Sequence, residues 1–184
     1  MTLEKSGKDL VEAYFHNQDK NLIEQLIAKF KAIKTREKLS RITGIKNKWV
    51  LQKLMDLGVK PQMMMVLTLV PLIEVAWADG HISKEERELI LKEASKTGIK
   101  EGTEAYMLLS SWLGTKPKKQ LFTSWNVYVE GLCNELSANQ IVDLKNDVLA
   151  RARAVAEASG GILGIGKVSK SEKLVLEKLE APFR

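Results

Sequence analysis

The most informative segment of this 184-residue chain reads Val75-Ala-Trp-Ala-Asp-Gly-His-Ile-Ser-Lys-Glu-Glu86. Its apolar start stops at an Asp-Gly pair, which is a strong turn signal. Ser83 then begins a Ser-x-x-Glu pattern that ends at Glu86. In such a capping box the Ser hydroxyl accepts from a backbone amide of the first helical turn, and the Glu side chain accepts from the Ser amide. The segment therefore predicts one helix before the turn and a second helix directly after Ser83.

A similar unit recurs near the end of the chain. It reads Ala158-Ser-Gly160 and, after six extra residues, Val168-Ser-Lys-Ser-Glu172. A third capping box, Ser137-Ala-Asn-Gln140, predicts one more helix start. Two similar helix pairs in one domain predict a pseudo-symmetric bundle in which the pairs bury each other.

The remaining apolar periodicity is helical, and no stretch alternates as a half-buried strand would. An apolar stripe over 22–33 predicts a first helix. Further helices are predicted at 36–43, 47–57, 61–78, 84–96, 103–113, 118–134, 138–158 and 170–180. The run over 61–78 lacks a polar face, so it is expected to be buried on most sides. Among the tryptophans, Trp77 and Trp112 are expected in the core, and Trp49 and Trp125 are candidates for it. The predicted fold class is all-α.

Composition excludes several classes of protein. The chain is 45% hydrophobic and 28% charged, which excludes wholesale disorder. Its one cysteine, Cys133, excludes an intrachain disulfide framework and a four-cysteine zinc site. Enzyme signatures such as His-Glu-x-x-His and Gly-x-Ser-x-Gly are absent, so no reaction is predicted. The sequence has no signal-peptide pattern and no apolar run of membrane-spanning length, so a cytoplasmic protein is expected.

Positive charge is concentrated in the first third of the chain. Residues 1–60 hold 13 Lys and Arg against 7 Asp and Glu, which accounts for the whole net charge of +6. This asymmetry predicts a basic helical N-terminal segment over 1–60, followed by a neutral helical domain over 61–184.

The basic segment raises a nucleic-acid hypothesis. A partial helix-turn-helix pattern surrounds Gly44, and a helix-hairpin-helix pattern fits similarly. The apolar positions of the helix-turn-helix are met by Leu39, Ile45 and Val50 and missed by Thr43 and Lys53. The cations that would contact phosphates are Lys31, Lys34, Lys38, Arg41, Lys46 and Lys48. The preferred alternative is a solvated basic face on helices that pack against the main domain.

The unit over Val75–Glu86 resembles the signature of the tellurite-resistance TerB-like family, and the unit that ends at Glu172 resembles the second half of that family's domain. The similarity covers about residues 61–180. The resemblance implies a small, all-helical, cytoplasmic domain that is associated with tellurite resistance and stress and is not an enzyme. It also implies a divalent-metal site at Asp79, Glu86 and Glu172. Ser159 stands where the second Asp of the family pattern would be.

The residues themselves leave two interpretations of these acids. A true EF-hand is excluded, because Val75 and Trp77 occupy its first two ligand positions. A looser site for calcium, magnesium or manganese would require Asp79, Glu86 and Glu172 to converge. The preferred alternative is that both glutamates cap helices and that Asp79 binds turn amides.

The sequence therefore predicts a non-catalytic, cytoplasmic binding or scaffold protein of TerB-like type with protein partners. A divalent cation is its candidate ligand. The runner-up is a nucleic-acid-associated protein that binds through its basic N-terminal helices.

Overall fold

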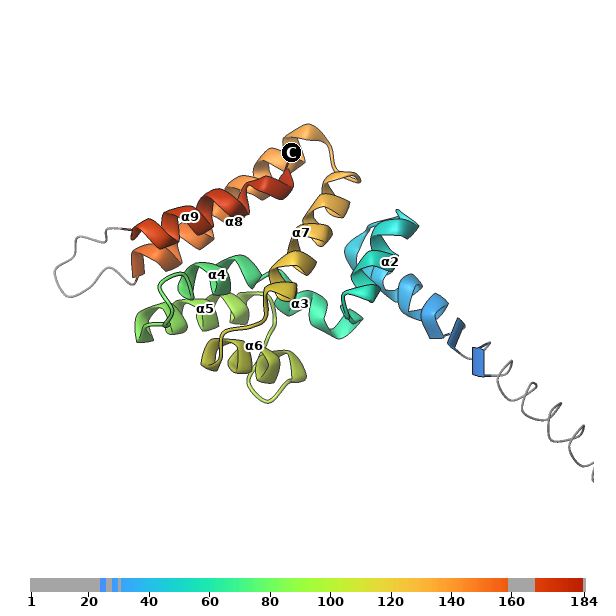
Figure 1. The fold of residues 1–184 in the computed structure, drawn as a ribbon, viewed down its shortest axis with the longest axis horizontal. Coiled ribbons are helices and arrows are strands. Elements are labelled where there is room, and N and C mark those ends of the chain that lie inside the picture. The colour runs from blue at the N-terminus through green and yellow to red at the C-terminus, as the bar shows by residue number, and fades with distance from the viewer. Residues whose placement is uncertain (1–23, 26–27, 30, 159–167, 184) are drawn as a thin grey trace, which may run out of the picture. The chain divides into compact units, whose positions relative to one another are not determined.

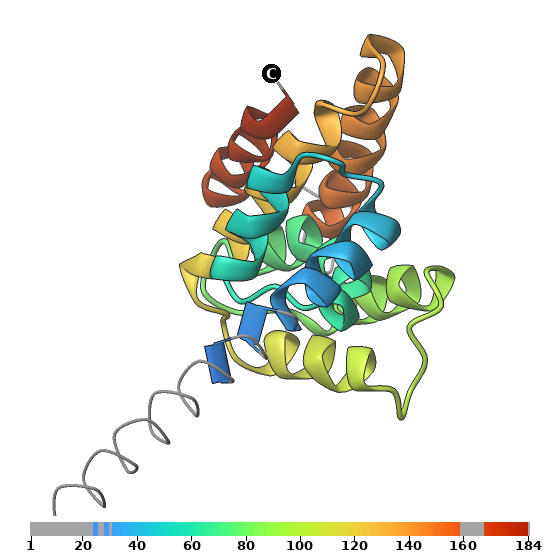
Figure 2. The ribbon, with the colours of Figure 1, turned by 90° about the vertical axis from the view of Figure 1, so that its right-hand side faces the viewer.

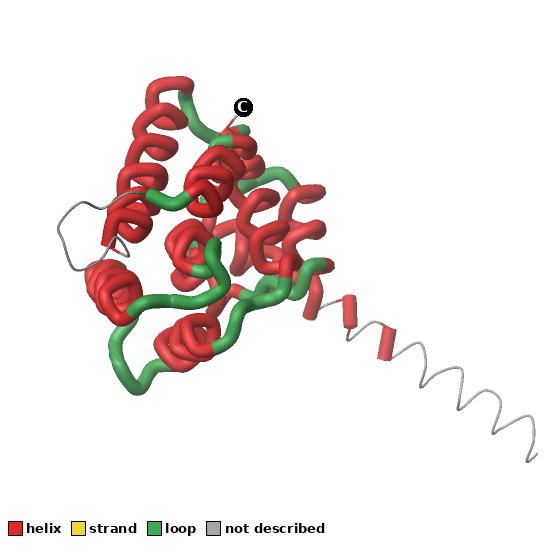
Figure 3. Tube along the Cα trace, turned by 60° about the vertical axis from the view of Figure 1, so that its left-hand side comes forward, coloured by secondary structure: helices red, strands yellow, loops and turns green. Residues whose placement is uncertain are grey.

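The structure is a computed structural model that describes residues 24–25, 28–29, 31–158 and 168–183. In these ranges every regular element is a helix, which confirms the all-α prediction (Figure 3). The chain divides into two units, Met1–Lys38 and Leu39–Arg184. Most of the predicted stripe over 22–33, together with Ser159 and the six extra residues 162–167, lies outside the described residues.

The first unit is described mainly over residues 31–38, which are helical. The sequence placed the domain boundary near residue 60, whereas the chain divides between Lys38 and Leu39. The physical reason is burial, because apolar side chains between residues 39 and 60 belong to the main hydrophobic core. These side chains are Leu39, Ile45, Val50, Leu51, Leu54 and Val59.

The second unit begins with a helical hairpin, which we define as helical residues 39–43, the turn 44–47 and α2 (Lys48–Asp56). Gly44 has a φ of +75°, a left-handed conformation that favours glycine. Asn47 caps α2, since its side chain accepts from the amides of Trp49 and Val50. Figure 2 faces this side and shows the chain reversing direction before α2.

The predicted single helix over 61–78 is wrong, because the structure breaks it into three pieces. They are η1 (Pro61–Met63), α3 (Met64–Leu67) and α4 (Val70–Ala76). Pro71 has no backbone N–H to continue the α3 ladder and disfavours helical geometry in the residue before it, so it fits only at the start of a new helix. The predicted burial is confirmed, since α4 exposes little of its surface and Glu74 is its one half-buried residue.

Two helix pairs form the centre of the second unit. The first pair is α4 with α5 (Lys84–Lys96), and the second is α8 (Ala138–Ala158) with α9 (Lys170–Leu179). The pairs pack on each other, and α4 contacts α9 in the same way that α8 contacts α5 (Figure 1). The all-helical bundle is therefore confirmed, and its pseudo-symmetry stays a prediction.

Two further helices complete this unit. They are α6 (Glu104–Gly114) and α7 (Lys119–Cys133), and a short turn, η2 (Ala181–Phe183), follows α9. Trp125 on α7 is 1% exposed and stacks on Phe122 with a centroid distance of 5.7 Å. Its other neighbour is Phe183, at 6.2 Å. The aromatic cluster therefore ties the end of the chain to α7. None of the described helices is long and apolar enough to cross a membrane.

The hairpin is fixed to α7 by an unusually close approach. A side-chain carbon built on Gly131 of α7 would collide with Cγ1 of Val50 and lie 3.1 Å from Cδ1 of Ile45. Only glycine leaves room for α2 at this distance. The backbone amide of Lys46 also donates to Oε1 of Glu135 over 2.7 Å. One face of the turn and of α2 is thus packed against α7 and Glu135, and the opposite face is exposed to solvent.

Candidate functional site

The three predicted metal ligands lie at the two turns of the helix pairs. Asp79 follows α4, and its Oδ1 accepts from the His81 amide over 3.2 Å. The same oxygen lies 3.2 Å from Nδ1 of His81, and both side chains are exposed. Asp79 therefore binds its own turn, as the preferred sequence interpretation expected.

Glu86 and Glu172 occupy equivalent positions in two complete capping boxes. Oε2 of Glu86 accepts from the Ser83 amide over 2.7 Å, and Oε2 of Glu172 accepts from the Ser169 amide over 2.6 Å. In return each serine hydroxyl accepts from the glutamate amide over 3.2 Å. Each glutamate is only 3% exposed. Both therefore act as buried helix caps, which confirms the two capping-box predictions.

The third capping box is present in a variant form. Oε1 of Gln140 accepts from both the amide and the hydroxyl of Ser137, each over 2.9 Å. The side chain of the third helical residue thus reaches back to the residue before the helix, as the pattern predicts.

The two buried glutamates are close enough to influence each other. Burial raises the pKa of the Glu86 carboxyl, and the negative charges of Asp79 and Glu172 raise it further. The hydrogen bonds from Ser83 act in the opposite direction. A carboxyl group that is buried and has negative neighbours is costly to ionise unless a cation lies close to it.

The acids do not fit the metal site that the family resemblance implies. Across the described ranges, no three His, Cys, Asp or Glu side chains are grouped so that they could hold a metal ion. One carboxylate oxygen of each buried glutamate also accepts a hydrogen bond from a backbone amide of its own turn. The observed geometry is that of helix capping, and we assign no step to a metal here.

The six predicted cationic residues are all exposed. Lys31, Lys34 and Lys38 belong to the first unit, where their spacing places them on one helix face. Arg41, Lys46 and Lys48 belong to the hairpin of the second unit.

The three apolar positions of the partial helix-turn-helix pattern around Gly44 are buried in the structure. Leu39, Ile45 and Val50 are at most 5% exposed, as apolar positions of that pattern should be. Thr43 is buried, but its hydroxyl donates to the Leu39 carbonyl over 2.8 Å and accepts from the Ile45 amide over 3.2 Å. A polar residue is therefore tolerated inside this turn.

Sequence reasoning missed the most unusual residue of the hairpin. Trp49 was a core candidate, but its side chain is 67% exposed. Lys53, one turn further along α2, places its ammonium nitrogen 4.7 Å from the centre of the indole ring. Ile42, on the other side of the turn, is 55% exposed. We call these residues and the neighbouring cations the hairpin surface, which comprises Arg41, Ile42, Lys46, Lys48, Trp49 and Lys53.

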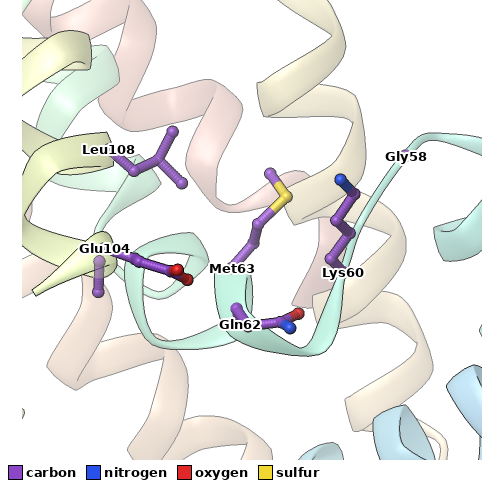
Figure 4. Close-up of a pocket in the computed structure, with 7 residues that line it drawn as sticks. Gly58, Lys60, Gln62, Met63, Glu104 and Leu108 are labelled. Atoms are coloured by element: carbon purple, nitrogen blue, oxygen red, sulfur yellow. The ribbon is translucent and has the colours of Figure 1, made fainter.

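A second feature is an open hollow between η1 and the start of α6. It has a volume of about 430 Å³ and is lined by Gly58, Lys60, Gln62, Met63, Glu104, Ala105 and Leu108. Figure 4 shows Lys60, Gln62 and Met63 on one side and Glu104 and Leu108 on the other. Its lining offers one amine, one carboxylate and one amide but no pair of nucleophile and base, so it does not form a catalytic constellation.

Comparisons with family models, with curated proteins and with solved structures give no significant match for this chain. Function is therefore inferred from the residues and their geometry.

Proposed function

We propose that this chain is a non-catalytic binding module that acts as a scaffold, and that the hairpin surface is where it holds a protein partner. The observation that carries the proposal is the exposure of Trp49, which is 67% accessible on a helix whose opposite face is fully packed. Tryptophan and arginine are the residues most enriched among the energetic centres of protein interfaces. A large aromatic side chain left in solvent on a rigid support is therefore best explained by a partner that covers it.

We further propose that the module is of TerB-like type and works in the cytoplasm. The Val75–Glu86 unit, the second unit ending at Glu172 and the reciprocal packing of the helix pairs support the family assignment. A single cysteine in the chain is in keeping with a reducing compartment. Growth of a tellurite-sensitive bacterium with and without this protein tests the stress association, and equal growth at every tellurite concentration would contradict it.

Photo-crosslinking inside cells tests the binding function. A photoreactive amino acid is placed at position 49, and the control chains carry it at Val142 on α8 or at Leu174 on α9, which are 54% and 58% exposed. We expect a protein adduct from position 49 that mass spectrometry identifies reproducibly and that the two controls do not give. Equal labelling from all three positions, or no protein adduct from position 49, would refute the proposal.

A second candidate function is nucleic-acid binding, which the exposure of all six predicted cations favours. Neutralising phosphates releases counterions, so affinity must fall steeply as salt rises. Titration of a duplex and of a single-stranded oligonucleotide at several salt concentrations tests this candidate. A flat salt response would exclude it.

A further inference from the structure

We propose that the partner of the hairpin surface is an acidic amphipathic helix, and this inference rests on the binding function proposed above. The first observation is the placement of two exposed apolar side chains on one short hairpin. Ile42 precedes the turn and Trp49 follows it, and both are more than half exposed. The other strongly exposed apolar side chains of this unit's described residues lie on four different helices, and they are Met65, Met107, Val142 and Leu174. Single exposed apolar residues are normal, whereas this short hairpin exposes two, and we take Ile42 and Trp49 together as the anchor for a partner.

The second observation is that the support of this anchor is preorganised. Val50, Leu51 and Leu54 are at most 5% exposed on the inner face of α2. Asn47 caps the helix, and the Lys46 amide donates to Glu135. A surface that is already rigid loses little conformational entropy when a partner binds.

The third observation is the charge around the anchor. Arg41, Lys46 and Lys48 are exposed, and within the described part of the chain none of them forms an ion pair. The acid of α2, Asp56, lies at the far end of the helix and accepts from Nε2 of Gln52 over 2.9 Å. Glu135 places one carboxylate at the turn, where its Oε1 accepts from the Lys46 amide. The three cations of the hairpin outnumber it, so the electrostatic complement of the anchor is acidic.

The secondary structure around the surface favours a helix as the complementary element. An added strand would need an exposed sheet edge, and the described residues form only helices. An amphipathic helix presents apolar residues at every third and fourth position, which suits an anchor of two side chains, and its flanks can carry carboxylates toward the cations. Nucleic acid would use the cations and could stack on Trp49, but it gives the exposed Ile42 side chain no comparable apolar partner.

The experiment uses fluorescence anisotropy with the full chain and a labelled synthetic helix that has a leucine-rich face and glutamate flanks. A matched peptide keeps the apolar face and carries lysine in place of every glutamate. We expect the acidic peptide to bind and the basic peptide to bind at least about tenfold more weakly, a difference of roughly 1.4 kcal/mol. Trp49→Ala and Lys48→Glu should each weaken binding of the acidic peptide by about tenfold or more. The controls Val142→Ala and Lys173→Glu, which alter exposed residues of α8 and α9, should leave the Kd unchanged.

Three results would overturn the inference. They are equal binding of both peptides, no effect of Trp49→Ala or Lys48→Glu on the acidic peptide, and binding of an oligonucleotide through these same residues by a chain that does not bind the acidic peptide. If the acidic helix fails to bind while position 49 still crosslinks to a protein in cells, the partner chemistry is wrong and the binding function stands. If both assays fail, the proposed function fails as well.

Discussion

The ammonium nitrogen of Lys53 lies 4.7 Å from the centre of the Trp49 ring. A cation over an exposed ring contributes about 0.5–1 kcal/mol, which favours this orientation of the indole. The pair therefore lies on the outside of α2 and adds little to the stability of the fold.

Truncation of Trp49 and truncation of Trp125 should destabilise the protein to very different degrees. Trp49→Ala removes an exposed side chain and one cation contact, so the free energy of unfolding should fall by about 1 kcal/mol or less. Trp125→Ala removes a side chain that is 1% exposed and should cost about 3–5 kcal/mol. Urea denaturation of both variants measures the difference. A loss at Trp49 as large as the loss at Trp125 would mean that Trp49 is a structural residue.

The close approach of α2 and α7 predicts a coupled pair of substitutions. Gly131→Ala adds a methyl group against Cγ1 of Val50 and should destabilise the protein by about 1–3 kcal/mol. Val50→Ala removes that carbon and should destabilise it through the lost burial. In the double variant the added methyl group occupies the freed space, so the losses should not add, and the coupling should reach about 0.5–3 kcal/mol. Simple additivity in urea denaturation would show that the helices are not packed this closely.

The buried cap Glu86 predicts a pH dependence with a defined sign. Burial raises the pKa of its carboxyl above the ordinary value of 4.5, so the folded state binds more protons than the unfolded state as this group titrates. Stability contributed by Glu86 is therefore present at low pH and is lost as pH rises through the raised pKa. Glu74, whose pKa burial also raises despite Lys116 and Lys178, acts in the same direction.

Glu86→Gln keeps an oxygen that can accept from Ser83 and removes the charge. As pH rises above about 4.5, the free energy of unfolding of Glu86→Gln should fall less than that of the wild type. Glu85→Gln, an exposed neighbour in the same helical turn, is the matched control and should keep the wild-type profile. A Glu86→Gln profile parallel to that of the wild type would contradict the assignment.

The acidic turns should not respond to divalent cations. After EDTA treatment, the Tm should stay constant when calcium, magnesium or manganese is added at millimolar concentration. A ligand of the folded state present at 100 times its Kd adds about 2.7 kcal/mol, which moves the Tm of a domain of this size by several degrees. Such a rise, if it disappears in Asp79→Ala and Glu86→Ala, would restore the metal hypothesis.

Local chemistry explains which parts of the fold were predictable from sequence. The starts of α5, α8 and α9 follow from capping boxes, which involve only four consecutive residues each. The break before Pro71 does not show in the apolar pattern, because that run is nearly continuous and only the missing amide donor of Pro71 marks the break. Residues 39–60 join the main core through contacts such as that between Val50 and Gly131. These two residues are far apart in the chain, and no sequence pattern indicates that they meet.

The candidate site was predictable from sequence only in part. The cationic residues stand out in the composition, and their exposure follows from their charge. Trp49 was misplaced because tryptophan is usually buried. A signal was nevertheless present, since α2 turns by 100° per residue and its apolar stripe of Val50, Leu51 and Leu54 leaves position 49 on the opposite side.

The most direct test of the account is an amide NMR spectrum of the isotope-labelled chain recorded during titration with the acidic amphipathic peptide. The account predicts that shifts concentrate on the amides of residues 41–53 and on the indole N–H of Trp49, and that α8 and α9 remain unchanged. Shifts centred instead on the hollow between Met63 and Leu108, or spread evenly over the helix pairs, would contradict the claim that the hairpin surface is the binding site.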